Sequence, residues 1–135
     1  MGRQRHRPST GKGLTLDAGA LIEVDRGNES IRALLERAAD RRIGIIVPTG
    51  ALAQAWRDGS RQVRLARLLK SDLVQVEDLT MARAQATGVL CGLRGTGDAI
   101  DASVVLIARQ YGGTVITGDS SDLLRLDPSL DIISV

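Results

Sequence analysis

The chain has 135 residues, of which 43% are hydrophobic and 25% are charged, and its formal net charge is +2. This length and composition are typical of one globular domain with its own core, and no apolar run approaches the ~18 residues of a membrane span. No signal-type hydrophobic stretch follows the basic N-terminus, so we expect a cytoplasmic protein. Aromatic side chains make up only 1% of the sequence, which excludes base stacking on an aromatic platform as its means of holding nucleic acid.

The positive charge is concentrated in the first twelve residues, which contain no acidic side chain. The rest of the chain holds 14 basic and 16 acidic residues. We therefore divide the sequence into a disordered basic arm, residues 1–12, and one domain, residues 13–135. The arm is suited either to contact RNA phosphates or to remain a solvated tail. Its cations are Arg3, Arg5, Arg7 and Lys12.

Short apolar stretches alternate with amphipathic segments along the domain. Because the stretches are rich in β-branched residues and are separated by segments with helical periodicity, they predict a parallel sheet covered by helices on both faces. We therefore expect an α/β fold, a three-layer α/β/α sandwich. In chain order the expected elements are a strand ending at Asp17 with a helix-like run after it, a helix over 29–42, a strand over 43–47, a helix over 61–70, a strand over 73–78, helices over 80–93 and 98–111, and strands over 114–117 and 131–135.

Carboxylates are placed where the expected strands end. Asp17 closes the first strand and Asp119 follows the fourth, while Asp98 and Asp101 fall in the first turn of the helix that leads into the fourth strand. In open parallel sheets, ligands bind beyond the carboxyl ends of the strands, at the point where the strand order reverses. If the first and fourth strands are neighbours at that point, these carboxylates converge on one rim of the sheet.

Each acid also has a simpler interpretation as part of a helix N-terminus. Four of the acids are suited to cap a helix or to stabilise its first turn through the helix dipole. They are Asp98, Asp101, Asp119 and Asp122, and capping is the preferred single-residue interpretation of Asp98 and Asp122. Asp17 has no strong cation partner nearby in the sequence. Gathered carboxylates repel one another, and a divalent cation such as Mg²⁺ or Mn²⁺ removes that cost. The group as a whole therefore favours a metal site.

The order and spacing of these segments resemble the PIN-domain ribonucleases, and most closely the toxins of VapBC-type toxin–antitoxin pairs. The resemblance covers residues 14–135. It rests on "LTLDAGALI" around the first acid, "VPTGALAQAWR" at the position of the second, "DAIDASVVLIA" around the third and "VITGDSSDLL" around the fourth.

The resemblance implies a metal-dependent endoribonuclease, in which a metal-bound water hydrolyses an RNA phosphodiester. Asp17, Asp101 and Asp119 would ligate Mg²⁺ or Mn²⁺ directly or through water, with Asp98 added to the metal site and Asp122 as a further helper. The resemblance also implies a homodimer that is inhibited by a small antitoxin protein. An RNA substrate, rather than a membrane, is the expected partner.

One position departs from the family pattern. Gln54 stands where these ribonucleases usually carry glutamate. A neutral amide still offers an oxygen to a metal-bound water but removes one negative charge. The alternative function is therefore a catalytically weakened PIN-like module that binds RNA or a protein. A phospho-accepting receiver domain fits less well, because Asp78 is off register and no lysine follows Lys70.

The expected helix over 61–70 combines cations with leucine and valine residues. Its basic side chains are suited to grip RNA phosphates or an acidic partner segment, or to form a solvated face whose stems cover apolar neighbours. We expect the apolar stripe of this helix to be exposed. This stripe is the only feature of the sequence itself that supports the predicted homodimer. The cations in and before this helix are Arg57, Arg61, Arg64, Arg67 and Lys70.

Overall fold

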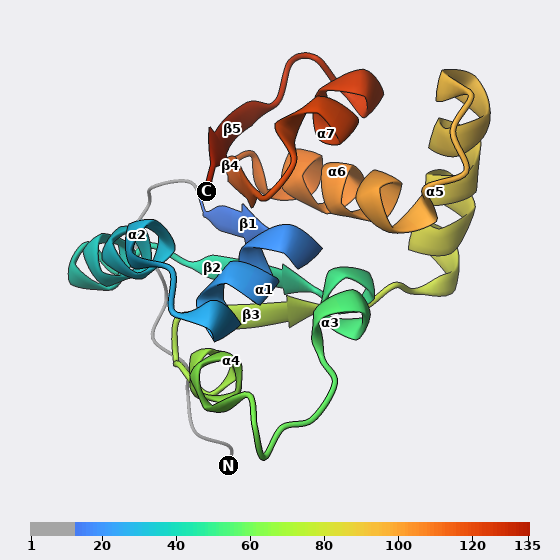
Figure 1. Ribbon diagram of the computed structural model, residues 1–135. Helices are drawn as coiled ribbons and strands as arrows, with labels where there is room; N and C mark the ends of the chain where they lie inside the picture. The colour runs from blue at the N-terminus through green and yellow to red at the C-terminus, as the bar shows by residue number, and fades with distance from the viewer. Residues whose placement is uncertain (1–12) are drawn as a thin grey trace, which may run out of the picture.

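The computed structural model describes residues 13–135, so the predictions for the arm of residues 1–12 lie outside the described part of the chain. The described residues form one parallel sheet with helices packed around it (Figure 1). The strands are β1 (Leu14–Leu16), β2 (Ile45–Pro48), β3 (Val74–Glu77), β4 (Thr114–Thr117) and β5 (Asp131–Ser134). The helices are α1 (Ala18–Arg26), α2 (Glu29–Asp40), α3 (Thr49–Ala55), α4 (Val63–Leu69), α5 (Met81–Arg94), α6 (Ala99–Tyr111) and α7 (Ser120–Leu126).

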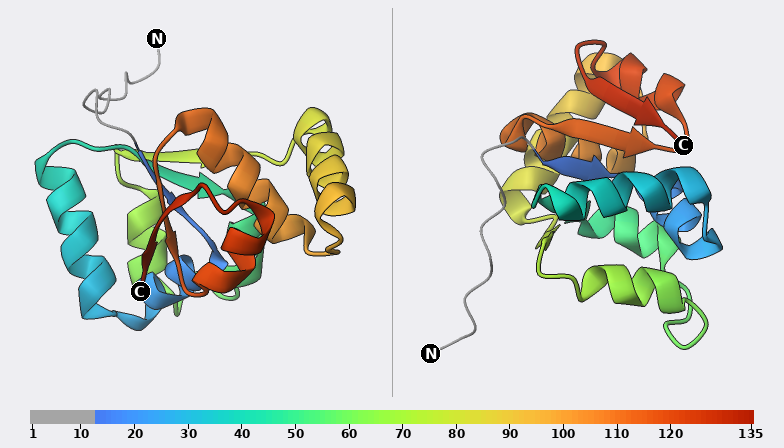
Figure 2. Two further views of the ribbon diagram at one scale, coloured as in Figure 1. Left: turned by 90° about the horizontal axis from the view of Figure 1, so that it is seen from above. Right: turned by 90° about the vertical axis from the view of Figure 1, so that its left-hand side faces the viewer.

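The strand order is β3-β2-β1-β4-β5, and every neighbouring pair is parallel. The chain moves outward from β1 to β3 and then crosses back to β4, so the order reverses between β1 and β4. Because crossovers between parallel strands are right-handed, the reversal puts α5, α6 and α7 on the face opposite the earlier helices. Figure 2 shows helices on both sides of the sheet. The predicted α/β fold, with the first and fourth strands adjacent, is confirmed.

The core lies on both faces of the two central strands. Leu16 of β1 and Ile116 of β4 are paired in register, and both are fully buried. On one face α1 packs against α2, α3 and α4, and on the other α6 packs against α5 and α7 and contacts β1 and β2. This core fixes the carboxyl ends of β1 and β4 against each other.

Gly19 and Gly118 bring the first turn of α1 against the chain segment that follows β4. A Cβ atom added to Gly19 would lie 2.9 Å from the Cα of Gly118, a distance that requires the backbone to shift. The two glycines therefore permit a close approach that any larger side chain would prevent. The approach holds the acid before α1 beside the segment that carries Asp119.

The exposed apolar residues do not lie where the sequence predicted them. In α4, Leu65 is fully buried, Leu68 and Leu69 pack against the core, and only Val63 is strongly exposed. The predicted exposed stripe of this helix is therefore wrong, because that face covers the core. Exposed apolar side chains instead occur on α5, which lies at the periphery in Figures 1 and 2. No helix within residues 13–135 is long and apolar enough to cross a membrane.

Candidate metal and active site

Asp17 directly follows β1 and is the N-cap of α1. Its carboxylate accepts hydrogen bonds from the Ala20 N–H at 2.8 Å, from the Gly118 N–H at 3.4 Å, and from the Thr117 hydroxyl. Only 5% of the residue is exposed. Burial raises the pKa of Asp17, and the hydrogen bonds from Thr117 and Ala20 oppose that effect. Asp17 is thus a buried carboxylate whose orientation is fixed by donors from α1 and from the end of β4.

Asp98 and Asp101 occupy the N-terminus of α6. Asp98 is exposed and caps the helix by accepting a hydrogen bond from the Asp101 N–H at 2.9 Å. Asp101, one turn into the helix, is half-buried. Burial raises the pKa of Asp101 to about 7, with further contributions from the charges of Asp98, Asp17 and Asp122. The fold therefore brings Asp101 close enough to three other carboxylates for their charges to disfavour its ionisation.

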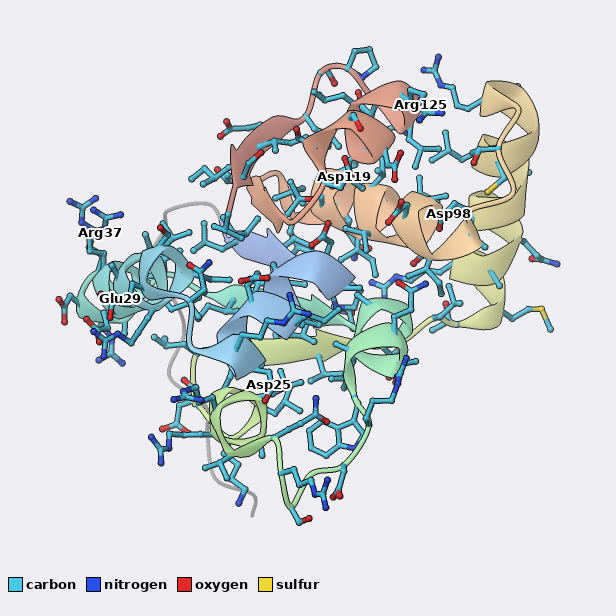
Figure 3. All side chains as sticks on the ribbon, viewed as in Figure 1. Asp25, Glu29, Arg37, Asp98, Asp119 and Arg125 are labelled. Atoms are coloured by element: carbon cyan, nitrogen blue, oxygen red, sulfur yellow. The ribbon has the colours of Figure 1, made fainter. Side chains whose placement is uncertain are left out.

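Asp119 and Asp122 belong to α7, across the site from α6. Asp119 is the N-cap, and its carboxylate accepts from the Ser121 N–H at 3.1 Å and from the Ser121 hydroxyl at 2.7 Å. These hydrogen bonds lower the pKa of Asp119, whose own charge contributes to the raised pKa of Asp17. Asp122 is paired with Arg125 at 3.2 Å. Figure 3 shows Asp119 and Asp98 on α7 and α6.

The simpler interpretation, helix capping, therefore holds for Asp98 and Asp119, and it also holds for Asp17, for which the sequence did not suggest it. Asp122 instead forms an intrahelical ion pair in the first turn of α7. A capping aspartate uses one carboxylate oxygen for the helix and keeps the other lone pairs for a further ligand. Capping and metal binding are consequently compatible for these residues.

A cavity of about 180 Å³ opens between the end of α5, the start of α6 and α7. It contains three of the five predicted acids, together with two arginines that the sequence analysis did not select. Asp17 and Asp119 do not line it. The lining residues are Arg94, Gly95, Thr96, Asp98, Asp101, Asp122, Arg125 and Leu126.

Gln54 lies on the last turn of α3 and is exposed. It is one turn beyond Gly50, which faces Ile100 and Ser103 of α6: a Cβ atom at Gly50 would lie 2.9 Å from the Ile100 Cδ1 atom. Residues four apart share a helix face, so Gln54 is on the side of α3 that is directed toward α6. It does not line the cavity that contains Asp101. Its role as the second position of the acidic site stays a prediction.

The donor chemistry of the cluster suits a hard divalent cation, since all of its candidate ligands are carboxylate oxygens. The raised pKa of Asp101 comes first from burial and then from the negative charges of Asp98, Asp17 and Asp122, and a cation would offset the second contribution. Within residues 13–135, however, no three His, Cys, Asp or Glu side chains form a group that could hold one ion directly. Mg²⁺ retains several waters in proteins, so a site at these carboxylates would need ligation that is partly through water.

Thr117 is a side chain of the candidate site that sequence reasoning missed. Its hydroxyl donates to Asp17 and accepts from the Asp119 N–H at 2.9 Å, so it connects the two predicted ligands. Thr117 and Asp17 are 100 residues apart in the chain. No spacing rule relates them, and only the pairing of β1 with β4 brings them together.

No family model matches the sequence, and no curated protein matches it. Solved structures, in contrast, match over nearly the whole chain. The VapBC2 structure from Rickettsia felis, bound to a DNA fragment from its promoter, has a TM-score of 0.66 and 17% identity, and the match covers 90% of this chain and 98% of that one. FitAcB from Neisseria gonorrhoeae has a TM-score of 0.59 and 19% identity, with 89% and 96% covered.

A third match is to VapC20 of Mycobacterium tuberculosis, a toxin that cleaves the sarcin-ricin loop. Its TM-score is 0.58 at 17% identity, with 82% of this chain and 94% of that chain covered. At these identities the matches establish the fold. The chain has the fold of the VapC- and FitB-type PIN-domain toxins, as its sequence resemblance predicted.

Proposed function

We propose that this protein is a Mg²⁺- or Mn²⁺-dependent endoribonuclease and the toxin of a toxin–antitoxin pair, acting on RNA in the cytoplasm. The observation that carries the proposal is the surroundings of Asp101 at the strand-order reversal of a PIN-like sheet: the residue is half-buried, Asp98 and Asp122 line the same cavity, and Asp17 is near enough for its charge to act on it. Unbalanced carboxylates at such a crevice are suited to a divalent ion. The toxin VapC20, which shares the fold, cleaves RNA.

In this proposal Asp17, Asp101 and Asp119 hold the ion directly or through water, with Asp98 beside them. When bound, the ion lowers the pKa of a water and offsets negative charge on the phosphodiester as it is attacked. Hydrogen bonds from Ala20 and Thr117 already fix the orientation of the Asp17 carboxylate. Burial and then the neighbouring charges raise the pKa of Asp101 to about 7, and a cation beside it would favour its ionised form.

The second candidate is the weakened binding module. The observations that favour it are the neutral side chain at Gln54 and the finding that no three carboxylates within residues 13–135 are grouped for one ion. Such a module would bind RNA at the same rim without cutting it. The two candidates differ in one measurable property, which is divalent-dependent cleavage.

The antitoxin is proposed to bind the apolar groove between α1, α2 and α4. This groove encloses about 520 Å³, and its apolar floor is bordered by three arginines and one acid, Glu36. An amphipathic helix with acidic residues at its edges matches that surface. The VapBC2 and FitAcB structures with the same fold support an antitoxin partner. The apolar residues of the groove are Val24, Ile31, Leu35, Ala39 and Leu68, and its arginines are Arg32, Arg64 and Arg67.

The proposed homodimer uses α5 rather than α4. The side chains of Met81, Val89 and Leu93 on α5 are 76%, 64% and 78% exposed. A helix with several large apolar residues in water is a typical interaction surface. The face formed by these three residues has no charge of its own, so two copies can meet without electrostatic repulsion.

The test of the proposed function is cleavage of a mixed RNA pool by purified full-length protein that has been freed of any bound antitoxin. We expect cutting with Mg²⁺ or Mn²⁺ and none with a chelator. Asp17→Asn and Asp119→Asn should abolish cutting while the circular dichroism spectrum is unchanged. Asp40→Asn, an exposed acid at the end of α2, is the matched control and should cut normally. Stable RNA binding without cutting under every metal condition would support the binding module instead.

A further inference from the structure

Two arginines face the same cavity as the carboxylates. Arg94 is the last residue of α5, and Arg125 lies in the last turn of α7. Both line the 180 Å³ cavity together with Asp98, Asp101 and Asp122. Figure 3 shows Arg125 on α7 and Asp98 at the start of α6. The cavity therefore combines anionic and cationic sides, whereas a site built for a cation alone needs only the anionic one.

We propose that Arg94 and Arg125 form a phosphate-binding subsite that holds the RNA backbone beside the phosphodiester to be cleaved. This proposal rests on the proposed function and specifies how that same site retains its substrate. Carboxylates repel an RNA phosphate, and an ion compensates that repulsion only at its own position. The neighbouring phosphates require cations from the protein, and guanidinium groups suit them because they donate two parallel hydrogen bonds.

Arg94 is held at the edge of the cavity by the end of its helix. Gly95 follows it with a φ of +67°, a left-handed conformation that ends α5, and the Gly95 N–H donates to the Cys91 carbonyl. Arg94 is exposed and forms no ion pair with any acid in the described residues. A solvated arginine next to three carboxylates, and not paired with one of them, is available for an anionic ligand.

Arg125 is paired but only weakly. Its partner Asp122 lies one turn earlier in α7, at 3.2 Å, and the two side chains are 80% and 45% exposed. Exposed pairs at this helical spacing contribute little stability, so the guanidinium can turn from Asp122 to a phosphate at small cost. The pair alone has a simpler explanation as surface stabilisation of a short helix. That explanation does not account for Arg94 on the opposite wall.

The experiment measures binding of a labelled single-stranded RNA to the full chain by fluorescence anisotropy, with Ca²⁺ in place of Mg²⁺ to suppress cutting. Arg94→Gln and Arg125→Gln should each weaken binding about 3- to 10-fold, and the double variant further. Each should also reduce the slope of log affinity against log salt by about one, as expected for one lost phosphate contact. Arg→Lys at either position should restore part of the affinity, because charge returns without the two-bond geometry.

The matched control is Arg26→Gln. Arg26 also forms an exposed pair with an acid three residues earlier, Glu23 at 3.1 Å, but at the end of α1 remote from Asp17. The Arg26→Gln variant should bind the RNA with an affinity within twofold of wild type. Equal affinity and equal salt slope for wild type, Arg94→Gln and Arg125→Gln would overturn the subsite even if the wild type cuts RNA. Arginine-dependent binding by a protein that never cuts would support the subsite and overturn the nuclease.

Discussion

The replacement Asp101→Asn tests whether the carboxylate cluster lacks a counter-charge when no ion is bound. The pKa of Asp101 is raised to about 7, chiefly by burial and then by Asp98, Asp17 and Asp122. An acid whose pKa is raised on folding contributes most stability below its unfolded pKa, near 4, and loses it as the pH rises to 7. An asparagine keeps the shape and the hydrogen-bonding capacity but carries no charge at any pH.

The size of the effect follows from that pKa. A rise from 3.8 to about 7 corresponds to an upper limit of roughly 4 kcal/mol. Asp101 is only half-buried and shares its interactions with Asp98, so solvent screening reduces this to about 1–2 kcal/mol. For a domain of this size the ion-free variant should melt roughly 3–8 °C above wild type at pH 8. The difference in melting temperature between the two proteins should vanish near pH 4, where the side chain at position 101 is uncharged in both folded proteins.

The assay is thermal melting of both proteins from pH 4 to pH 8, first in chelator and then with Mg²⁺ or Mn²⁺. Added ion should raise the melting temperature of wild type, since it binds only the folded state, and should raise that of Asp101→Asn much less. Glu36→Gln removes one negative charge from the exposed face of α2 and should show neither effect. A variant that is less stable than wild type at pH 8 in chelator, with an unchanged pH profile, would refute the reasoning.

Three further outcomes are expected. Gln54→Glu should lower the melting temperature in chelator and bind Mn²⁺ about tenfold more tightly, which corresponds to ~1.4 kcal/mol; equal metal dependence would place Gln54 outside the site. Asp127→Asn should cost about 1.5–3 kcal/mol at pH 7, because the pKa of Asp127 is lowered to about 2 by hydrogen bonds from Ser129 and then Arg109. This stability is present above pH 4 and is lost as the pH falls to 2. The free energies of unfolding of wild type and variant in urea should therefore differ at neutral pH and become equal near pH 2. Leu93→Glu should convert a dimer to a monomer by light scattering, and a monomeric wild type would contradict the α5 interface.

The prediction for Asp127 concerns how α6 and α7 are held together around the site, since Asp127 is not a proposed ligand. Asp127 ends α7, and its carboxylate accepts from Arg109 of α6 at 2.7 Å. The pair joins the helix that carries Asp101 to the one that begins at Asp119. Its loss should therefore weaken metal binding somewhat while leaving every proposed ligand in place.

Local pattern in the sequence determined the fold class and the order of the elements. The short, apolar, β-branched stretches indicated buried strands, and the helical segments between them favoured parallel pairing. The β4 bounds, Thr114–Thr117, match the predicted strand. Asp17 and Asp119 were predicted at strand ends because a carboxylate interrupts each apolar run in the sequence.

Contacts between distant segments were decided only by the tertiary structure. The hydrogen bond of Thr117 to Asp17 depends on the strand order, and so does the charge that reaches Asp101 from Asp17 and Asp122. Both α4 and α5 carry several apolar residues, and burial distinguishes the two helices. α4 packs against β3 and α1, whereas α5 packs mainly against α6 and α7. Amphipathic periodicity identifies an apolar face, but only the neighbouring elements determine whether water or protein covers it.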